Sequence, residues 1–239
     1  MKQYEAVILA LETLGGQATL AQLYQETMKV PHVNWGTRTP FASIRRIVQE
    51  RPEIFKVRPG LWALESHRSK LGLPRATAKK PVADEATHSY YQGLLATIGN
   101  LRGYSTYIPN QDKNKICLRK PLGDLRSLQE LPPFSFDYIT RRVATIDVSW
   151  FNDRRMPDSL FEVEHSTDIQ NSLLKFYDLQ DFSARMIIVA APSRRREFEH
   201  KRSHSAFHHI AERVSFYDYE TLVRDYEHEA LRSSADFTL

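Results

Sequence analysis

Three acidic residues in two neighbouring segments have the types and the spacing of a metal site. Asp147 lies in residues 143–150, and Glu162 and Glu164 lie in residues 159–166. Both segments predict strands, in which alternate side chains share a face, so Glu162 and Glu164 point the same way. If the strands pair across the turn between them, Asp147 falls roughly opposite Glu162. Three carboxylates on one patch need a proton or a cation, so the sequence predicts a site for a divalent ion such as Mg²⁺.

The composition of the chain is that of a globular protein with a mildly basic charge. Of its 239 residues, 41% are hydrophobic and 26% are charged, and the formal net charge is +4 at pH 7. This charge suits a nucleic-acid partner without requiring one. Cys117 is the single cysteine, which excludes an intrachain disulfide and a cysteine-rich zinc site, so we expect a reducing, cytoplasmic setting. We expect no membrane span and, because no phosphate-binding glycine loop is present, no nucleotide cofactor.

The chain divides into two regions of different pattern. Residues 67–87 contain prolines and small polar residues without periodicity, and we predict them to be a linker. Residues 1–66 form a short domain, and residues 88–239 form a larger one. The predicted elements of the first domain are helices at residues 4–14, 20–28 and 41–50 and a β-hairpin at residues 54–64.

The ends of the helices in the first domain carry recognisable signals. Thr19 is a candidate N-cap of the second helix, and Thr39 followed by Pro40 opens the third. The apolar stripe of the third helix predicts which of its side chains are buried: Phe41, Ile44, Ile47 and Val48.

Three helices followed by a hairpin resemble the winged helix-turn-helix domains of DNA-binding proteins, on Thr39-Pro40 and on residues 60–64. The resemblance implies that the third helix enters the major groove of double-stranded DNA and that the hairpin holds the phosphate backbone. The residues expected to contact DNA are Arg38, Ser43, Arg45, Arg46, Gln49, Lys56 and Arg58. Winged helices also serve as protein–protein modules, and Arg45 and Arg46 would then be solvent-exposed charges only.

The second domain alternates helices and strands, which predicts an α/β core with a mixed sheet. The predicted order is a helix at 90–100, a strand at 103–109, the two acidic strands, a helix opened by Thr167, a strand at 186–190, a basic helix at 194–213 and a strand at 214–217. Thr167 and Gln170 have the spacing of a capping box, and Asp168 adds favourable charge in the first turn. The basic helix either contacts phosphates or faces solvent.

This order of elements resembles the PD-(D/E)XK nuclease superfamily, in particular the restriction endonucleases, across residues 88–220. The matching motifs are Ile146-Asp147-Val148 and the residues 161–166. One position departs from the superfamily pattern, because Glu164 stands where a lysine is usual. Lys175, on the following helix, is the candidate that replaces this lysine.

The resemblance implies a division of roles among the acidic residues. Asp147, Glu162 and the carbonyl of Val163 are expected to hold Mg²⁺, a hard cation that prefers oxygen ligands. Glu164 is expected to orient or deprotonate the attacking water, and Lys175 is expected to assist electrostatically. The alternative is that the carboxylates lie on a solvent-exposed strand face and pair with basic neighbours, namely Arg141, Arg142 or Arg154.

The sequence therefore supports the hypothesis of a Mg²⁺-dependent endonuclease of bacterial restriction type, which cuts double-stranded DNA at a specific site, with a modified base as one option. Two strands need two active sites, so we expect a homodimer. A non-catalytic DNA-binding regulator with a nuclease-like dimerisation domain is one alternative. A DNA repair or junction nuclease is another.

Overall fold

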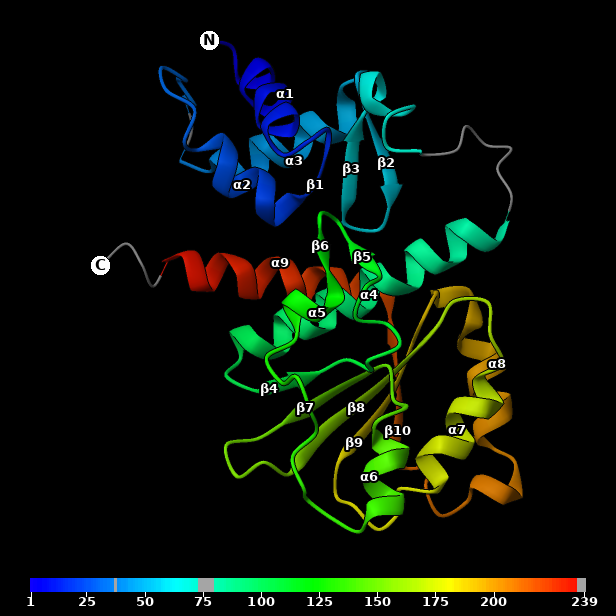
Figure 1. Ribbon diagram of the computed structural model, residues 1–239. Coiled ribbons are helices and arrows are strands. Elements are labelled where there is room, and N and C mark those ends of the chain that lie inside the picture. The colour runs from blue at the N-terminus through cyan, green and yellow to red at the C-terminus, as the bar shows by residue number, and fades with distance from the viewer. Residues whose placement is uncertain (37, 73–79, 236–239) are drawn as a thin grey trace. The chain divides into compact units, whose positions relative to one another are not determined.

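The computed structural model describes residues 1–36, 38–72 and 80–235 (Figure 1). The chain forms two compact units, which are described separately: an N-terminal unit of Met1–Lys79 with Ala230–Leu239, and a core unit of Lys80–Glu229. Within the described residues, none of the helices combines the length and the apolar character needed to cross a membrane.

The N-terminal unit contains the three predicted helices and the predicted hairpin. The helices are α1 (Gln3–Thr13), α2 (Leu20–Thr27) and α3 (Pro40–Glu50), and the strands are β1 (Gln17–Thr19), β2 (Ile54–Arg58) and β3 (Leu61–Leu64). The strands form an antiparallel sheet in the order β1-β3-β2. The strand β1 was not predicted, because three residues are too few to show an alternating pattern.

Local signals in the N-terminal unit act largely as expected. Gly15 and Gly16 end α1 with positive φ angles of 83° and 90°, which glycine adopts at low cost. Thr19 caps α2 through a capping box: its Oγ1 accepts from the N–H of Gln22 at 3.2 Å, and the Gln22 Oε1 accepts from the N–H of Thr19 at 2.9 Å. The predicted N-cap at Thr19 is therefore confirmed.

The apolar stripe of α3 packs into the core of the N-terminal unit, with one exception. Ile44, Ile47 and Val48 are buried, as predicted. Phe41 is 39% exposed, so its predicted burial is wrong. It lies in the first turn of α3, where its ring meets only the edge of the core, 4.7 Å from the ring of Tyr24.

A five-stranded mixed sheet forms the centre of the core unit, in the order β10-β9-β8-β7-β4. Its strands are β4 (Ser105–Tyr107), β7 (Val148–Phe151), β8 (Pro157–Glu164), β9 (Arg185–Ala190) and β10 (Val214–Asp218). The pairs β4–β7 and β7–β8 are antiparallel, and β8–β9 and β9–β10 are parallel. The predicted mixed α/β core is confirmed. A short hairpin, β5 (Ile116–Cys117) and β6 (Lys120–Pro121), stands apart from this sheet.

Helices cover both faces of this sheet (Figure 1). The helices beyond the N-terminal three are α4 (Lys80–Leu101), α5 (Leu122–Leu125), α6 (Asp137–Val143), α7 (Ile169–Tyr177), α8 (Arg195–Arg202) and α9 (Tyr219–Ala235). Short 3-10 turns lie at Glu65–His67 in the N-terminal unit and at Pro192–Arg194 and Ser205–Phe207 in the core unit. Apolar residues of α6, α7 and α8 form one cluster with the sheet residues Leu160, Met186 and Ile188. On the other face, α4 contacts β4, β7 and β8. Both faces of β8 and β9 are therefore buried, as the apolar run at 186–190 predicted.

The linker prediction at residues 67–87 differs from the structure at its C-terminal end. Residues 73–79 lie outside the described residues, but α4 begins at Lys80 and so includes residues 80–87. The prolines suggested a break, yet Pro81 falls in the first turn of α4, where a proline leaves no helical hydrogen bond unmade.

Two other boundaries in the core unit were predicted wrongly. The first acidic strand was expected over residues 143–150, but α6 extends to Val143 and β7 begins only at Val148. Ile146 alternates with Val148 and Trp150 as strand residues do, but it lies before β7, and its side chain and that of Val143 at the end of α6 are both buried in the core. The basic helix expected at 194–213 ends at Arg202, and α9 was not predicted at all.

Candidate active site

The three acidic residues meet where β7 begins and β8 ends. Asp147 immediately precedes β7, and Glu162 and Glu164 lie in the last half of β8. The register pairs Val148 with Phe161, so Asp147 stands opposite Glu162, as the sequence predicted. The Asp147 Oδ2 also accepts a hydrogen bond of 2.8 Å from the N–H of Val163, which fixes the carboxylate against β8.

These carboxylates are buried and do not lie on a solvent-exposed strand face. Asp147 is 9% exposed, Glu162 2% and Glu164 4%, because β8 is a central strand covered on both faces. The alternative of a solvated face paired with nearby arginines is therefore wrong. Arg142 instead pairs with Asp178 at 2.6 Å. Buried charges of one sign require neutralising partners close at hand.

Lys175 of α7 supplies that partner for Glu162. Its Nζ lies 2.9 Å from both Glu162 carboxylate oxygens and 3.1 Å from the carbonyl oxygen of Thr145. Burial, together with the charges of Asp147 and Glu164, raises the pKa of Glu162 well above its ordinary value, against the opposing charge of Lys175. Burial lowers the pKa of Lys175, but the charge and hydrogen bond of Glu162 outweigh it and the pKa is raised. The ammonium therefore stays protonated beside Glu162.

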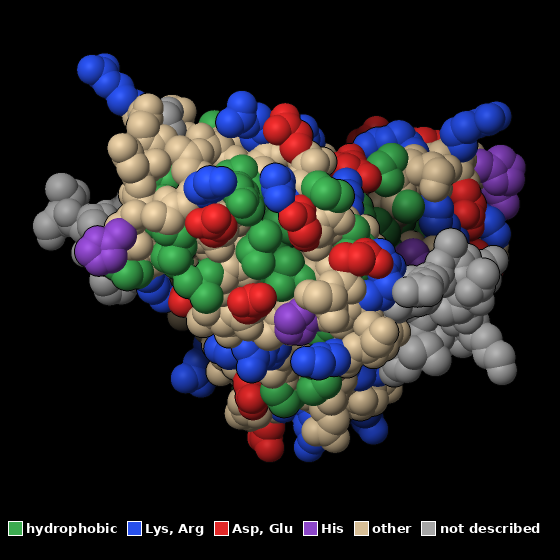
Figure 2. Space-filling view, turned by 90° about the horizontal axis from the view of Figure 1, so that it is seen from above, with side chains coloured by type: hydrophobic (Ala, Val, Ile, Leu, Met, Phe, Trp, Pro, Cys, Tyr) green, Lys and Arg blue, Asp and Glu red, His purple; other side chains and the backbone are tan. Residues whose placement is uncertain are grey.

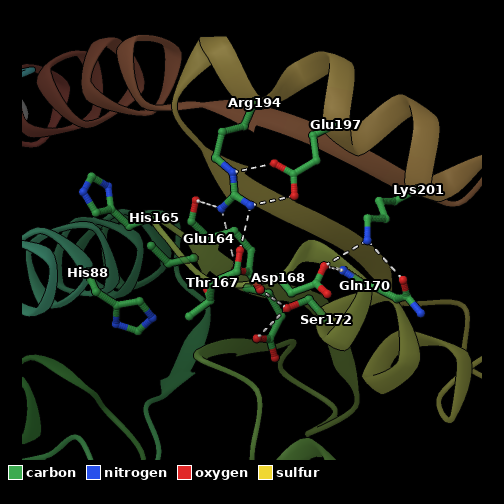
Figure 3. Close-up of polar contacts among 12 residues, drawn as sticks. His88, Glu164, His165, Thr167, Asp168, Gln170, Ser172, Arg194, Glu197 and Lys201 are labelled. Carbon is green, nitrogen blue, oxygen red and sulfur yellow. Dashed lines mark hydrogen bonds and ion pairs between the residues drawn. The ribbon is translucent and has the colours of Figure 1, made fainter. Parts of the chain in front are cut away.

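Glu164 is held by hydroxyl groups and by an arginine (Figure 3). Ser172 Oγ donates to Glu164 and also lies 3.2 Å from Glu162 Oε2, so it links the two glutamates. Thr167 Oγ1 donates to the other oxygen of Glu164. Arg194 reaches the Glu164 carbonyl oxygen at 3.1 Å and approaches its carboxylate at 4.0 Å. The orientation of Glu164 is consequently fixed from several sides.

The contacts of Thr167 correct the expected start of α7. The residue that caps this helix is Asp168, whose Oδ1 accepts from the N–H of Gln170 at 2.9 Å. This hydrogen bond, followed by that of Lys201, lowers the pKa of Asp168. Thr167 is not the cap, because its hydroxyl is used by Glu164. Arg194 lies just before α8, in the segment that was expected either to contact phosphates or to face solvent. It contacts the acidic site instead.

Two further residues of α4 contact Asp147 and were missed in the sequence. His88 Nε2 lies 3.0 Å from Asp147 Oδ2, and Gln92 Nε2 donates to the Asp147 carbonyl oxygen at 3.3 Å. Burial lowers the pKa of His88, but the hydrogen bond and charge of Asp147 exceed this effect and the pKa is raised. Their spacing of four residues on one helix was the signal available, since such residues share a face.

The donor chemistry of the site fits Mg²⁺. Asp147 and Glu162 bring hard oxygen atoms together, and Mg²⁺ retains several waters, so one or two carboxylates suffice to bind it. Among the residues that the structure describes, no group of three His, Cys, Asp or Glu side chains forms a metal-ligand set. Lys175 holds both oxygens of Glu162, so a cation bound here would share that carboxylate with the ammonium or displace it.

The residues expected to contact DNA lie in the N-terminal unit. Arg38, Arg45, Arg46, Gln49 and Lys56 are exposed, and Ser43 and Arg58 are half-buried. Arg45 Nε donates to the Tyr24 hydroxyl at 3.3 Å, and Arg46 lies 4.0 Å from Glu50. Figure 2 shows lysine and arginine side chains scattered among acidic ones on the face it draws. The exposed side of α3 is polar and partly basic, since it carries Arg45, Arg46 and Gln49.

Comparison with known proteins identifies the class as a restriction-enzyme family. Residues 73–236 match the family model described as the type II restriction enzyme NmeDI C-terminal domain, and the chain belongs to this family. The predicted kinship with restriction endonucleases is thereby confirmed. The match covers the core unit and leaves residues 1–72 outside it.

One known restriction enzyme is similar to part of this chain. The chain is 28% identical over 130 residues to the type II restriction enzyme NmeDI of Neisseria meningitidis serogroup C. The aligned part is 50% of this chain and 37% of that enzyme, so the similarity spans well under half the length of the relative. No solved structure matches the chain.

Proposed function

We propose that this protein is a Mg²⁺-dependent restriction endonuclease that hydrolyses phosphodiester bonds of double-stranded DNA with a PD-(D/E)XK-type site. The observation that carries the proposal is that Asp147, Glu162 and Lys175 meet at one buried site, where β7 begins and β8 ends. Two acids and a lysine brought together in this way fit hydrolysis of a phosphodiester better than a structural role, because burying three carboxylates opposes folding.

The residues divide the work as follows in this proposal. Asp147, Glu162 and the Val163 carbonyl hold Mg²⁺, which when bound supplies charge stabilisation for the phosphate and lowers the pKa of water. Glu164 orients the attacking water, and its own orientation is fixed by Ser172 and Thr167. The Lys175 ammonium adds positive charge beside Glu162, where the scissile phosphate must approach.

The N-terminal unit is proposed to be a winged-helix domain that binds the DNA. Its order of elements, three helices with a β1-β3-β2 antiparallel sheet, supports this assignment. The exposed polar side of α3 then lies in the major groove, and Lys56 and Arg58 of the hairpin contact the backbone. Because both strands must be cut, we further propose that two copies meet on the DNA.

Arg46→Ala tests the assignment of α3. We expect the affinity of the full chain for duplex DNA to fall about tenfold, the loss of one arginine contact to a base edge or phosphate. Fluorescence anisotropy at several salt concentrations measures this. Lys29→Ala, in the turn after α2, is the matched control, since Lys29 and Arg46 have similarly exposed side chains, 70% and 67%. Equal effects of the two substitutions on DNA affinity would mean that α3 is not the helix that enters the major groove.

Cleavage of plasmid DNA tests the function itself. The purified protein is incubated with methylated and with unmethylated plasmid, in Mg²⁺ and in EDTA. Discrete fragments in Mg²⁺ and none in EDTA are the expected result. Binding without cleavage of either plasmid would favour a regulator, and cutting of branched DNA alone would favour a repair nuclease.

A further inference from the structure

Asp147 directly precedes β7, outside the ladder of the sheet, and hydrogen bonds from other segments hold its carboxylate. Two donors act on the same oxygen, Oδ2: the N–H of Val163 at 2.8 Å and Nε2 of His88 at 3.0 Å. Among the described residues, no hydrogen bond reaches Oδ1. The pair of donors therefore fixes Oδ2, and Oδ1 is the oxygen that remains available to a ligand.

The helix α4 provides the frame for this contact. His88 and Gln92 lie one turn apart on the same face, and Gln92 is fully buried. Gln92 Nε2 donates to the Asp147 carbonyl oxygen and, at 2.8 Å, to Asp112 Oδ2. Asp147 is thus held by α4 at both its backbone and its side chain.

The three buried carboxylates each have one basic neighbour, and these neighbours come from different segments. Glu162 has Lys175 of α7, and Glu164 has Arg194 just before α8. The corresponding neighbour of Asp147 is His88 of α4. His88 hydrogen-bonds to Asp147, and Asp147 is the residue that lies opposite Glu162 in the register.

We propose that His88 is a positioning residue, whose Nε2–H fixes Asp147 so that Oδ1 is directed at the bound divalent cation. The inference rests on the proposed function. Its chemistry is that of an outer partner which orients a metal ligand, and loss of such partners weakens metal binding about 10- to 100-fold.

Two amide substitutions at position 88 distinguish the hydrogen-bond donor of His88 from the space that its side chain fills. In His88→Gln the side-chain nitrogen falls near the position of Nε2, whereas in His88→Asn it falls near Nδ1, too short to reach Asp147. Mn²⁺ binding to the full chain without DNA is measured by electron paramagnetic resonance, with circular dichroism to monitor folding. We expect His88→Asn to bind Mn²⁺ about 10- to 100-fold more weakly. We expect His88→Gln to lie within a few-fold of the wild type, and the exposed control His209→Asn to equal it.

The outcomes distinguish this inference from the function on which it rests. Wild-type affinity in His88→Asn would overturn the positioning role while leaving the metal site in place. Equal weakening in His88→Asn and His88→Gln would overturn it too, because the donor would then not be the cause. No Mn²⁺ binding by the wild type would remove the proposed metal site and this inference with it.

Discussion

Asp147→Asn is expected to lower the rate of DNA cleavage at saturating Mg²⁺ by about a thousandfold. Asp147 is one of two carboxylates proposed to hold the cation, and an amide retains the shape without the charge. A metal contributes several kcal/mol to the stabilisation of the transition state, and each 1.36 kcal/mol is a factor of ten in rate. Single-turnover cleavage of a duplex substrate measures the change.

The matched control for this prediction is Asp153→Asn, the same exchange in the exposed turn between β7 and β8. It is expected to cut like the wild type. DNA affinity measured without a divalent cation should be nearly the same in both variants, since the residues proposed to bind the duplex outside the cleavage site lie in the N-terminal unit. If Asp147→Asn retains full cleavage, the acidic site is not the site of hydrolysis.

Lys175→Met is expected to lower the free energy of unfolding in EDTA by about 3 kcal/mol, because it leaves Glu162 buried among like charges. This loss is at the lower end of the range for broken buried ion pairs, because the Lys175 side chain is 27% exposed and water screens part of its charge. Excess Ca²⁺ should restore part of the loss, because a ligand that binds only the folded state stabilises it. Urea denaturation with and without Ca²⁺ gives both quantities.

Lys201→Met is the control for Lys175→Met. The Lys201 side chain is 25% exposed, close to that of Lys175, but its partner Asp168 is 51% exposed. Ion pairs with exposed carboxylates contribute about 0–1 kcal/mol, so we expect a small loss without recovery by Ca²⁺. A comparable loss in the two variants would show that the acidic site places no special demand on Lys175.

The parts of the site that the sequence predicted are those set by local pairing. Asp147 directly precedes β7 and Glu162 lies in the adjacent β8, which follows after a short turn, so alternation and turn residues were enough to place them opposite each other. Lys175 could be assigned because it lies off the apolar stripe of α7. The DNA-contact residues of the N-terminal unit stay a prediction, as do the roles assigned to the acidic residues.

The parts that were missed depend on packing between distant segments. His88 is 59 positions from Asp147 and Arg194 is 30 from Glu164, and no periodicity links such pairs. Adjacent candidates such as Thr167 and Asp168 both suit an N-cap, and only the backbone decides between them. The strand predicted over 143–150 was too long for a related reason, since Ile146, buried from outside the strand, continues the alternation of Val148 and Trp150.

The ammonium of Lys175 between the two oxygens of Glu162 has a consequence for how the protein responds to metal supply. In the proposed function, a cation that displaces the ammonium from Glu162 gives up this ion pair in exchange for coordination. The affinity for the cation then reflects the free energy of coordination minus that of the lost Lys175–Glu162 ion pair. It is weaker than the same oxygen ligands would give without Lys175. If the proposed function holds, the Lys175 ammonium stabilises Glu162 when Mg²⁺ is scarce, so loss of the ion is expected to stop cleavage without unfolding the protein.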